Sequence, residues 1–217
     1  MPTPPPSPAP LASAPPPPGR LIPFDFATGA TYALGLTYAD HIRETGEKPG
    51  QPVVFLKRCA TATGEGAAHR LDFWSAAKSL PGFLPVSPRV WCPDGPSPET
   101  LPALVLETHV NGALRQSAST TSVIYPLRHM LQVAAATAPG RTLRQHDLVL
   151  TGTPAGITLS VPLWKRRLGL LLPRRQRIRA ALRGVQGNPR FLQPGNVVRV
   201  SAGWLGGLEC TITSNNA

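Results

Sequence analysis

Two threonines flank a glycine directly after a short apolar run. The segment Asp147–Gly156 reads DLVLTGTPAG, and its run Leu148–Leu150 predicts a buried strand. Thr151, Gly152 and Thr153 follow as a tight loop. A loop held by a rigid strand can direct hydroxyl and backbone N–H groups at an anion, and glycine allows close approach. These residue types predict a small polar binding site of a kind that many folds provide.

A histidine and a glutamate three residues apart form a second candidate. Asp40 is suited to cap one or two helical turns and Gly46 to end them. On such a helix His41 and Glu44 share a face. A carboxylate beside an imidazole fixes its tautomer and raises its basicity, which suits a general base that activates water. The spacing fits an ordinary solvated pair equally well.

The elements that would position these residues read mostly as strands. Residues 32–38 predict the first core strand. Residues 104–110 and 113–116 alternate apolar and polar side chains around Asn111-Gly112, the dipeptide that most strongly indicates a hairpin. A strand, a glycine turn and a second strand are expected to close the chain.

One longer helix is expected in the second half of the chain. Residues 126–136 place apolar side chains on a single helical face, and Thr121 or Ser122 is a candidate cap. The chain has 217 residues, of which 27 are proline and 20 glycine, and this composition argues against a helical bundle. The sequence therefore predicts a strand-rich α+β domain.

Both the first residues and a late segment differ from the rest in composition. Residues 2–19 contain ten prolines and predict a disordered tail over 1–20, followed by a single domain over 21–217. Residues 162–190 hold nine of the Lys and Arg residues and no acid, with apolar residues at helical spacing. They predict a basic helical insert, which either packs on the domain or contacts an anionic surface. Because the net charge is +11, the basic character belongs mainly to this insert.

Cysteine spacing and hydropathy suggest an intracellular protein. Cys59, Cys92 and Cys210 show neither paired nor metal-ligand spacing, as expected for reduced thiols. We expect no transmembrane segment, because no apolar run is long enough to span a bilayer, and we expect a cytoplasmic location.

Several segments together resemble one known family. Tyr38–Glu44 is similar to the YxDHxxE motif of the fumarylacetoacetate hydrolase (FAH) family, and Trp74–Ser79 to its WxxAKS motif. Asn111–Gln116 resembles VNGELRQ, and Leu150–Pro154 the LTGTP loop. The order of the segments also agrees. The resemblance implies a mixed β-roll of twisted sheets, truncated in the middle, and a homodimer.

The resemblance also assigns roles to residues. It implies that His41 is a catalytic base with Glu44 as its partner, and that Lys78 contacts an anionic substrate. Lys78 could equally extend to solvent at a surface. The resemblance further implies that Thr151, Gly152 and Thr153 bind a carboxylate or carbonyl group of the substrate.

The family's metal site is where this sequence departs from the pattern. Relatives hold Mg²⁺ or Mn²⁺ with a Glu-x-Glu pair and an aspartate, and this sequence has no Glu-x-Glu after Lys57. Glu65 and Asp72 are isolated acids, whereas hard cations need several converging oxygens. No metal ligand and no cofactor is therefore assigned.

Two functions are consistent with these residues. One is an enzyme, of full or reduced activity, that acts on a β-diketo acid, an acylpyruvate or a related 2-keto acid. It would catalyse C–C hydrolysis, decarboxylation or tautomerisation through an enolate or oxyanion. The other is a catalytically inactive relative that binds a small carboxylate or a protein partner.

Overall fold

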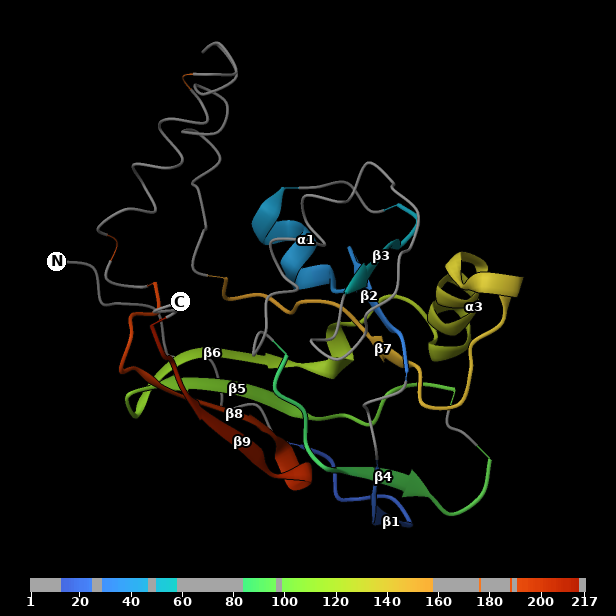
Figure 1. Ribbon diagram of the computed structural model, residues 1–217, viewed down its shortest axis with the longest axis horizontal. Helices are drawn as coiled ribbons and strands as arrows, with labels where there is room; N and C mark the ends of the chain where they lie inside the picture. Colours follow the sequence, from blue (N-terminus) through green and yellow to red (C-terminus); the bar gives the residue numbers. More distant parts are fainter. Residues whose placement is uncertain are drawn as a thin grey trace, which may run out of the picture.

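The described strands form three separate sheets, with two helices against them (Figure 1). The computed structural model describes residues 13–24, 29–46, 50–57, 84–96, 99–157 and 191–214, with the single residues 176 and 188. The four-stranded sheet has the order β6-β5-β8-β9, the three-stranded sheet β3-β2-β7, and β1 pairs with β4. This arrangement confirms the strand-rich α+β class.

The bounds of the elements in the described residues are as follows. The strands are β1 (Gly19–Pro23), β2 (Thr31–Gly35), β3 (Val53–Lys57), β4 (Arg89–Pro93), β5 (Val105–Val110), β6 (Ala113–Ser119), β7 (Leu148–Leu150), β8 (Val197–Ala202) and β9 (Gly207–Thr211). The helices are α1 (Ala39–Thr45) and α3 (Leu127–Thr137), with short 3-10 turns η1 (Thr120–Ser122), η2 (Pro139–Arg141) and η3 (Gly203–Leu205).

The three-stranded sheet determines where the candidate residues lie. β2 is its buried central strand, antiparallel to β3 and parallel to β7. Asp147 sets the register of β7, because its Oδ1 accepts the N–H of Ala30 at 2.8 Å. Since parallel strands end at the same edge of a sheet, the segments that follow β2 and β7 leave side by side.

α1 begins one residue earlier than its predicted cap. The residue at the N-cap is Tyr38, not Asp40, and it makes no side-chain capping bond. Asp40 instead lies in the first turn, where its Oδ1 accepts the N–H of His41. The predicted stop is confirmed, since Gly46 has φ 64°, in the left-handed region that glycine tolerates.

α3 packs its predicted apolar face on the three-stranded sheet. Met130 and Ala134 are fully buried, and Ala134 belongs to a core cluster with Tyr32. The predicted cap is wrong: Thr121 and Ser122 lie in η1, a separate turn. The residue at the N-cap of α3 is Pro126, which offers no side-chain acceptor.

The hairpin predicted at Asn111-Gly112 is confirmed. Asn111 has φ 49° and Gly112 φ 81°, so both residues are left-handed, as a two-residue type I′ turn requires. The turn joins β5 to β6, and β8 pairs with the other edge of β5.

Part of the proline-rich N-terminal segment contacts the domain. The Oγ of Ser13 accepts the N–H of Val105 at 2.9 Å, and Ala14 donates its N–H to Ala103. Ser13 and Ala14 therefore contact the start of β5 and the segment before it; residues 1–12 lie outside the described part, and the disordered tail over residues 1–20 stays a prediction. None of the described helices has the length and hydropathy needed to span a bilayer.

Candidate functional site

The segments that follow β2 and β7 are joined by threonine hydroxyls. Thr37 donates its hydroxyl to the backbone oxygen of Thr151. The hydroxyl of Tyr38 lies 3.5 Å from Oγ1 of Thr151. The first predicted substrate-binding threonine is thus held by two residues that directly precede α1.

Gly152 is a glycine for a steric reason as well as a conformational one. Its φ is 114°, a value that other residues rarely adopt. A Cβ at this position would lie 3.2 Å from the backbone oxygen of Leu34 and still closer to Thr37. The glycine therefore allows the loop after β7 to lie directly on the end of β2.

His41 and Glu44 lie on one face of α1, as the sequence predicts. Nδ1 of His41 is 3.6 Å from Oε2 of Glu44, and the two side chains are only 17% and 19% exposed. That separation is longer than a hydrogen bond, and Nδ1 is buried without a hydrogen-bond partner in the described part of the chain. A small approach of the carboxylate would complete a His–Glu dyad.

Glu44 also contacts the loop that carries the threonines. Its Oε2 accepts the N–H of Gly156 at 3.0 Å and lies 3.5 Å from the N of Ile157. Figure 1 shows the segment after β7 passing beside α1. The structure therefore brings the predicted base pair and the predicted binding loop together.

Gln116 on β6 holds the same loop from another side. Its Nε2 donates to the backbone oxygens of Ala155 at 2.7 Å and Pro154 at 3.2 Å. Thr108 on β5 donates to Oε1 of Gln116 at 3.3 Å. The loop after β7 thus lies between α1 and the four-stranded sheet.

Burial changes the acidity of the tyrosine in this cluster. Tyr38 is 2% exposed, and this burial raises the pKa of its phenol above 10.0. The hydrogen bond with Thr151 opposes the rise, and the charge of Asp40 adds to it. The hydroxyl is therefore neutral at physiological pH and available as a donor to Thr151.

The other predicted residues differ in how the structure describes them. Thr153 is exposed and makes no hydrogen bond in the described part, so its hydroxyl is free to meet a ligand. Lys78 and nearly all of residues 162–190 lie outside the described residues. Sequence reasoning assigned no role to Thr37, Tyr38 or Gln116. Tyr38 is the first residue of the YxDHxxE motif and Gln116 the last residue of the VNGELRQ motif, so these two motifs were the sequence signal that could have pointed to them.

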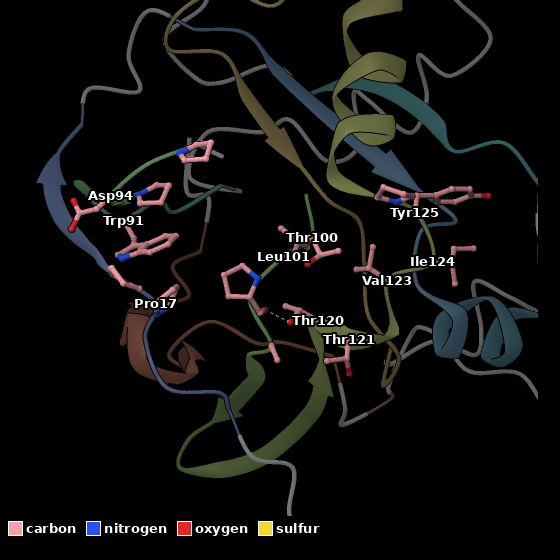
Figure 2. Close-up of a pocket in the computed structure, with 16 residues that line it drawn as sticks. Pro17, Trp91, Asp94, Thr100, Leu101, Thr120, Thr121, Val123, Ile124 and Tyr125 are labelled. Atoms are coloured by element: carbon pink, nitrogen blue, oxygen red, sulfur yellow. Dashed lines mark hydrogen bonds between the residues drawn. The ribbon is translucent and has the colours of Figure 1, made fainter. Parts of the chain in front are cut away.

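A large pocket lies next to this cluster (Figure 2), because its lining residues Val123 and Ile124 pair with Tyr38 and Thr37. Its volume is about 830 Å³, and Trp91, Asp94, Thr120 and Tyr125 are among its lining residues. None of the predicted site residues that the structure describes lines it, and the described residues of its lining include no histidine, lysine or arginine. We therefore take the His41–Glu44 cluster, which contains a potential base, as the candidate site.

The donor set offers no place for the family's metal within the described residues. No three His, Cys, Asp or Glu side chains converge there. His41 and Glu44 supply two groups, and Glu44 is already engaged with backbone N–H groups, which a cation would repel. The described residues do not fit a resident divalent ion.

Comparison with known proteins identifies similar sequences. A sequence model of a family described as "Fumarylacetoacetate (FAA) hydrolase C-terminal" matches residues 67–213. The chain is 28% identical over 185 residues to the 4-hydroxyphenylacetate degradation bifunctional isomerase/decarboxylase of Escherichia coli, covering 62% of this chain and 42% of that protein. It is 31% identical over 143 residues to the mitochondrial oxaloacetate tautomerase of Mus musculus, covering 64% of this chain and 52% of that protein. The chain thus spans about half the length of these curated relatives.

Solved structures show the same fold. A fumarylacetoacetate hydrolase from Exiguobacterium antarcticum superposes with a TM-score of 0.52 at 22% identity, covering 87% of this chain and 76% of that one. A 5-carboxymethyl-2-hydroxymuconate delta-isomerase from Mycobacterium smegmatis superposes with a TM-score of 0.52 at 20% identity, covering 87% of this chain and 80% of that one. At these identities the likeness establishes the fold alone.

Proposed function

Because this chain belongs to the fumarylacetoacetate hydrolase family, we propose that it is an enzyme acting on a small 2-keto acid. The substrate class is a β-diketo acid, an acylpyruvate or a related keto acid. The names of the two curated relatives, an isomerase/decarboxylase and an oxaloacetate tautomerase, support this class. Tautomerisation, decarboxylation and C–C hydrolysis of such acids share an enolate or oxyanion, so one site can serve any of them.

One contact carries the proposal. The Glu44 carboxylate lies 3.6 Å from the His41 imidazole and accepts the N–H of Gly156, which is 112 residues away in the chain. A potential proton acceptor and a loop rich in hydroxyl and N–H donors therefore lie side by side. Deprotonation next to a carbonyl group needs both a base and donors for the developing negative charge.

The proposed roles follow from the chemistry of each side chain. His41 takes the proton from the carbon next to the carbonyl group, with Glu44 stabilising the imidazolium that forms. Thr151, Gly152 and Thr153 bind the substrate carboxylate through hydroxyl and backbone N–H groups. Lys78 supplies positive charge to the enolate oxygen.

The roles proposed for these residues do not involve a metal ion. In family members the ion is Mg²⁺ or Mn²⁺, and it polarises the dicarbonyl group of the substrate. Among the residues that the structure describes, no donor set fits such an ion. The roles proposed for the residues of this chain are therefore proton transfer and anion binding.

Steady-state turnover of oxaloacetate and acetylpyruvate tests this function, with and without Mg²⁺. We expect turnover that falls at least about 100-fold in His41→Ala, the usual contribution of a general base. His109→Ala, on β5, is the matched control and should keep its rate. Full activity in His41→Ala would remove the base from the mechanism.

Absence of turnover would favour the second function, a catalytically inactive relative. If no keto acid reacts but oxalate or pyruvate raises the melting temperature, the chain is the inactive carboxylate-binding relative. In that case Glu44→Gln and Thr151→Val should change the rise in melting temperature that the ligand produces.

The homodimer and the basic segment are finer parts of the proposal. Sedimentation velocity should give a mass twice that of the 23.1-kDa chain. Salt-sensitive binding to phosphatidylserine vesicles that disappears on deletion of residues 162–190 would assign an anionic surface contact to that segment. A cytoplasmic location stays an expectation, which cell fractionation tests.

A further inference from the structure

We propose that Glu44 is a positioning residue that fastens α1 to the loop after β7, so that the base and the carboxylate-binding threonines are assembled as one unit. The inference rests on the proposed function and deepens it. It adds a second role to a residue whose expected role is to partner His41.

α1 and the loop contact each other at two separate places. At the start of α1, Thr37 and Tyr38 contact Thr151. At its last turn, Glu44 contacts Gly156 and Ile157. A helix of this length spans about 10 Å, so the two segments run alongside each other over the whole of α1.

The two contacts differ in strength. The first is fixed by close packing, because Gly152 leaves no space beside Thr37, and by the pairing of β2 with β7. The second consists of hydrogen bonds to one carboxylate. In the described residues, Glu44 makes the hydrogen bonds that join the last turn of α1 to this loop. Release of Glu44 would free that end of the helix while the other end stayed in place.

The loop that binds the Glu44 carboxylate is itself held in place by Gln116. Gln116 holds the backbone oxygens of Pro154 and Ala155, which precede the N–H groups that Glu44 binds. A Cβ on Gly156 would lie 3.0 Å from Cγ of Gln116, so the loop backbone packs directly on that side chain. Because the loop is braced from the sheet side, α1 is the partner that moves when the contact breaks.

Glu44 can serve the loop and His41 together. Its Oε2 accepts the N–H of Gly156, and a carboxylate has about four lone-pair sites on two oxygens. Oε1 makes no hydrogen bond in the described part of the structure, and Nδ1 of His41 lacks a partner there. Oε2 is also the oxygen that lies 3.6 Å from Nδ1, so a small approach lets it accept from His41 while it keeps the loop. His41 therefore gains its carboxylate partner when Glu44 holds α1 against the loop after β7.

Two substitutions separate this role from that of a simple dyad partner. In Glu44→Gln, the amide oxygen still accepts the N–H of Gly156, but the charge that stabilises an imidazolium is gone. In Glu44→Ala both the acceptor for the N–H of Gly156 and the negative charge are lost. A dyad partner alone predicts equal loss of kcat in the two variants and an unchanged KM. The positioning role predicts that KM rises in Glu44→Ala well beyond its value in Glu44→Gln.

The decisive measurement is hydrogen–deuterium exchange of the substrate-free protein at the amides of Gly156 and Ile157. Loss of a charge-assisted hydrogen bond should speed their exchange roughly tenfold in Glu44→Ala, and less in Glu44→Gln. Asp40→Asn is the matched control, because it removes a charge from α1 without touching the loop. Glu44→Asp, whose shorter side chain withdraws the carboxylate, gives the same test if Glu44→Ala does not fold.

The outcomes separate the two proposals. Unchanged exchange in folded Glu44→Ala or Glu44→Asp overturns the positioning role, whatever the kinetics show. Faster exchange in a protein that turns over no keto acid supports the positioning role and rejects the proposed enzyme.

Discussion

Gly152 lies so close to Thr37 that a Cβ on residue 152 would collide with the Oγ1 atom of Thr37. This contact joins the end of β7 to the segment that begins α1. It makes the binding loop and the base-bearing helix parts of one packed unit.

Gly152→Ala should destabilise the protein by about 2 to 4 kcal/mol, since strain at φ 114° adds to a clash with Thr37. Urea unfolding measures the loss. Gly195→Ala is the matched control, because Gly195 has φ 89° and nothing lies within 4 Å of its added Cβ. Equal losses in the two variants would show that the contact with Thr37 contributes nothing.

Gln116→Ala should cost about 1 to 3 kcal/mol of unfolding free energy, because two backbone oxygens lose their donor. We also expect a higher KM for a keto acid, since the loop loses its brace. Gln132→Ala, on the exposed face of α3, should stay within about 0.5 kcal/mol of the wild type. A wild-type KM in Gln116→Ala would argue against the brace.

Tyr38→Phe should flatten the fall in stability at alkaline pH. Burial raises the pKa of Tyr38, so above pH 10.0 the unfolded chain loses a proton that the folded chain keeps. Stability from this group is complete below that pH and is lost as pH rises through the folded-state value. Urea unfolding from about pH 9 to 11 tests this. Tyr32, whose pKa burial also raises, keeps its contribution in both proteins. The prediction would be contradicted if the free energies of unfolding of the wild type and of Tyr38→Phe fell in parallel as the pH rises.

Ser13→Ala should cost about 1 to 2 kcal/mol, because it leaves the N–H of Val105 without its acceptor. Thermal or urea unfolding measures this. Ser87→Ala removes an exposed bond to the N–H of Arg89 and serves as the control. An unchanged free energy of unfolding in Ser13→Ala would mean that the hydrogen bond between Val105 and Ser13 adds nothing to stability.

Elements with a strong local signal were predictable. The Asn111-Gly112 turn requires two left-handed residues, and few other dipeptides adopt that conformation. The apolar face of α3 and the stop at Gly46 follow equally local rules. The caps were less predictable, since Tyr38 and Pro126 occupy N-cap positions without offering a side-chain acceptor.

The sequence alone predicted the family, the fold class, a His–Glu pair on one helical face and a threonine loop after a strand. All of these depend on residues close together in the chain or on motif wording. That Glu44 contacts Gly156, in a loop that Gln116 holds from the sheet side, was decided by tertiary structure. The parallel pairing of β2 with β7 brings these segments together across more than a hundred residues, and no local spacing encodes which backbone N–H a distant carboxylate will meet.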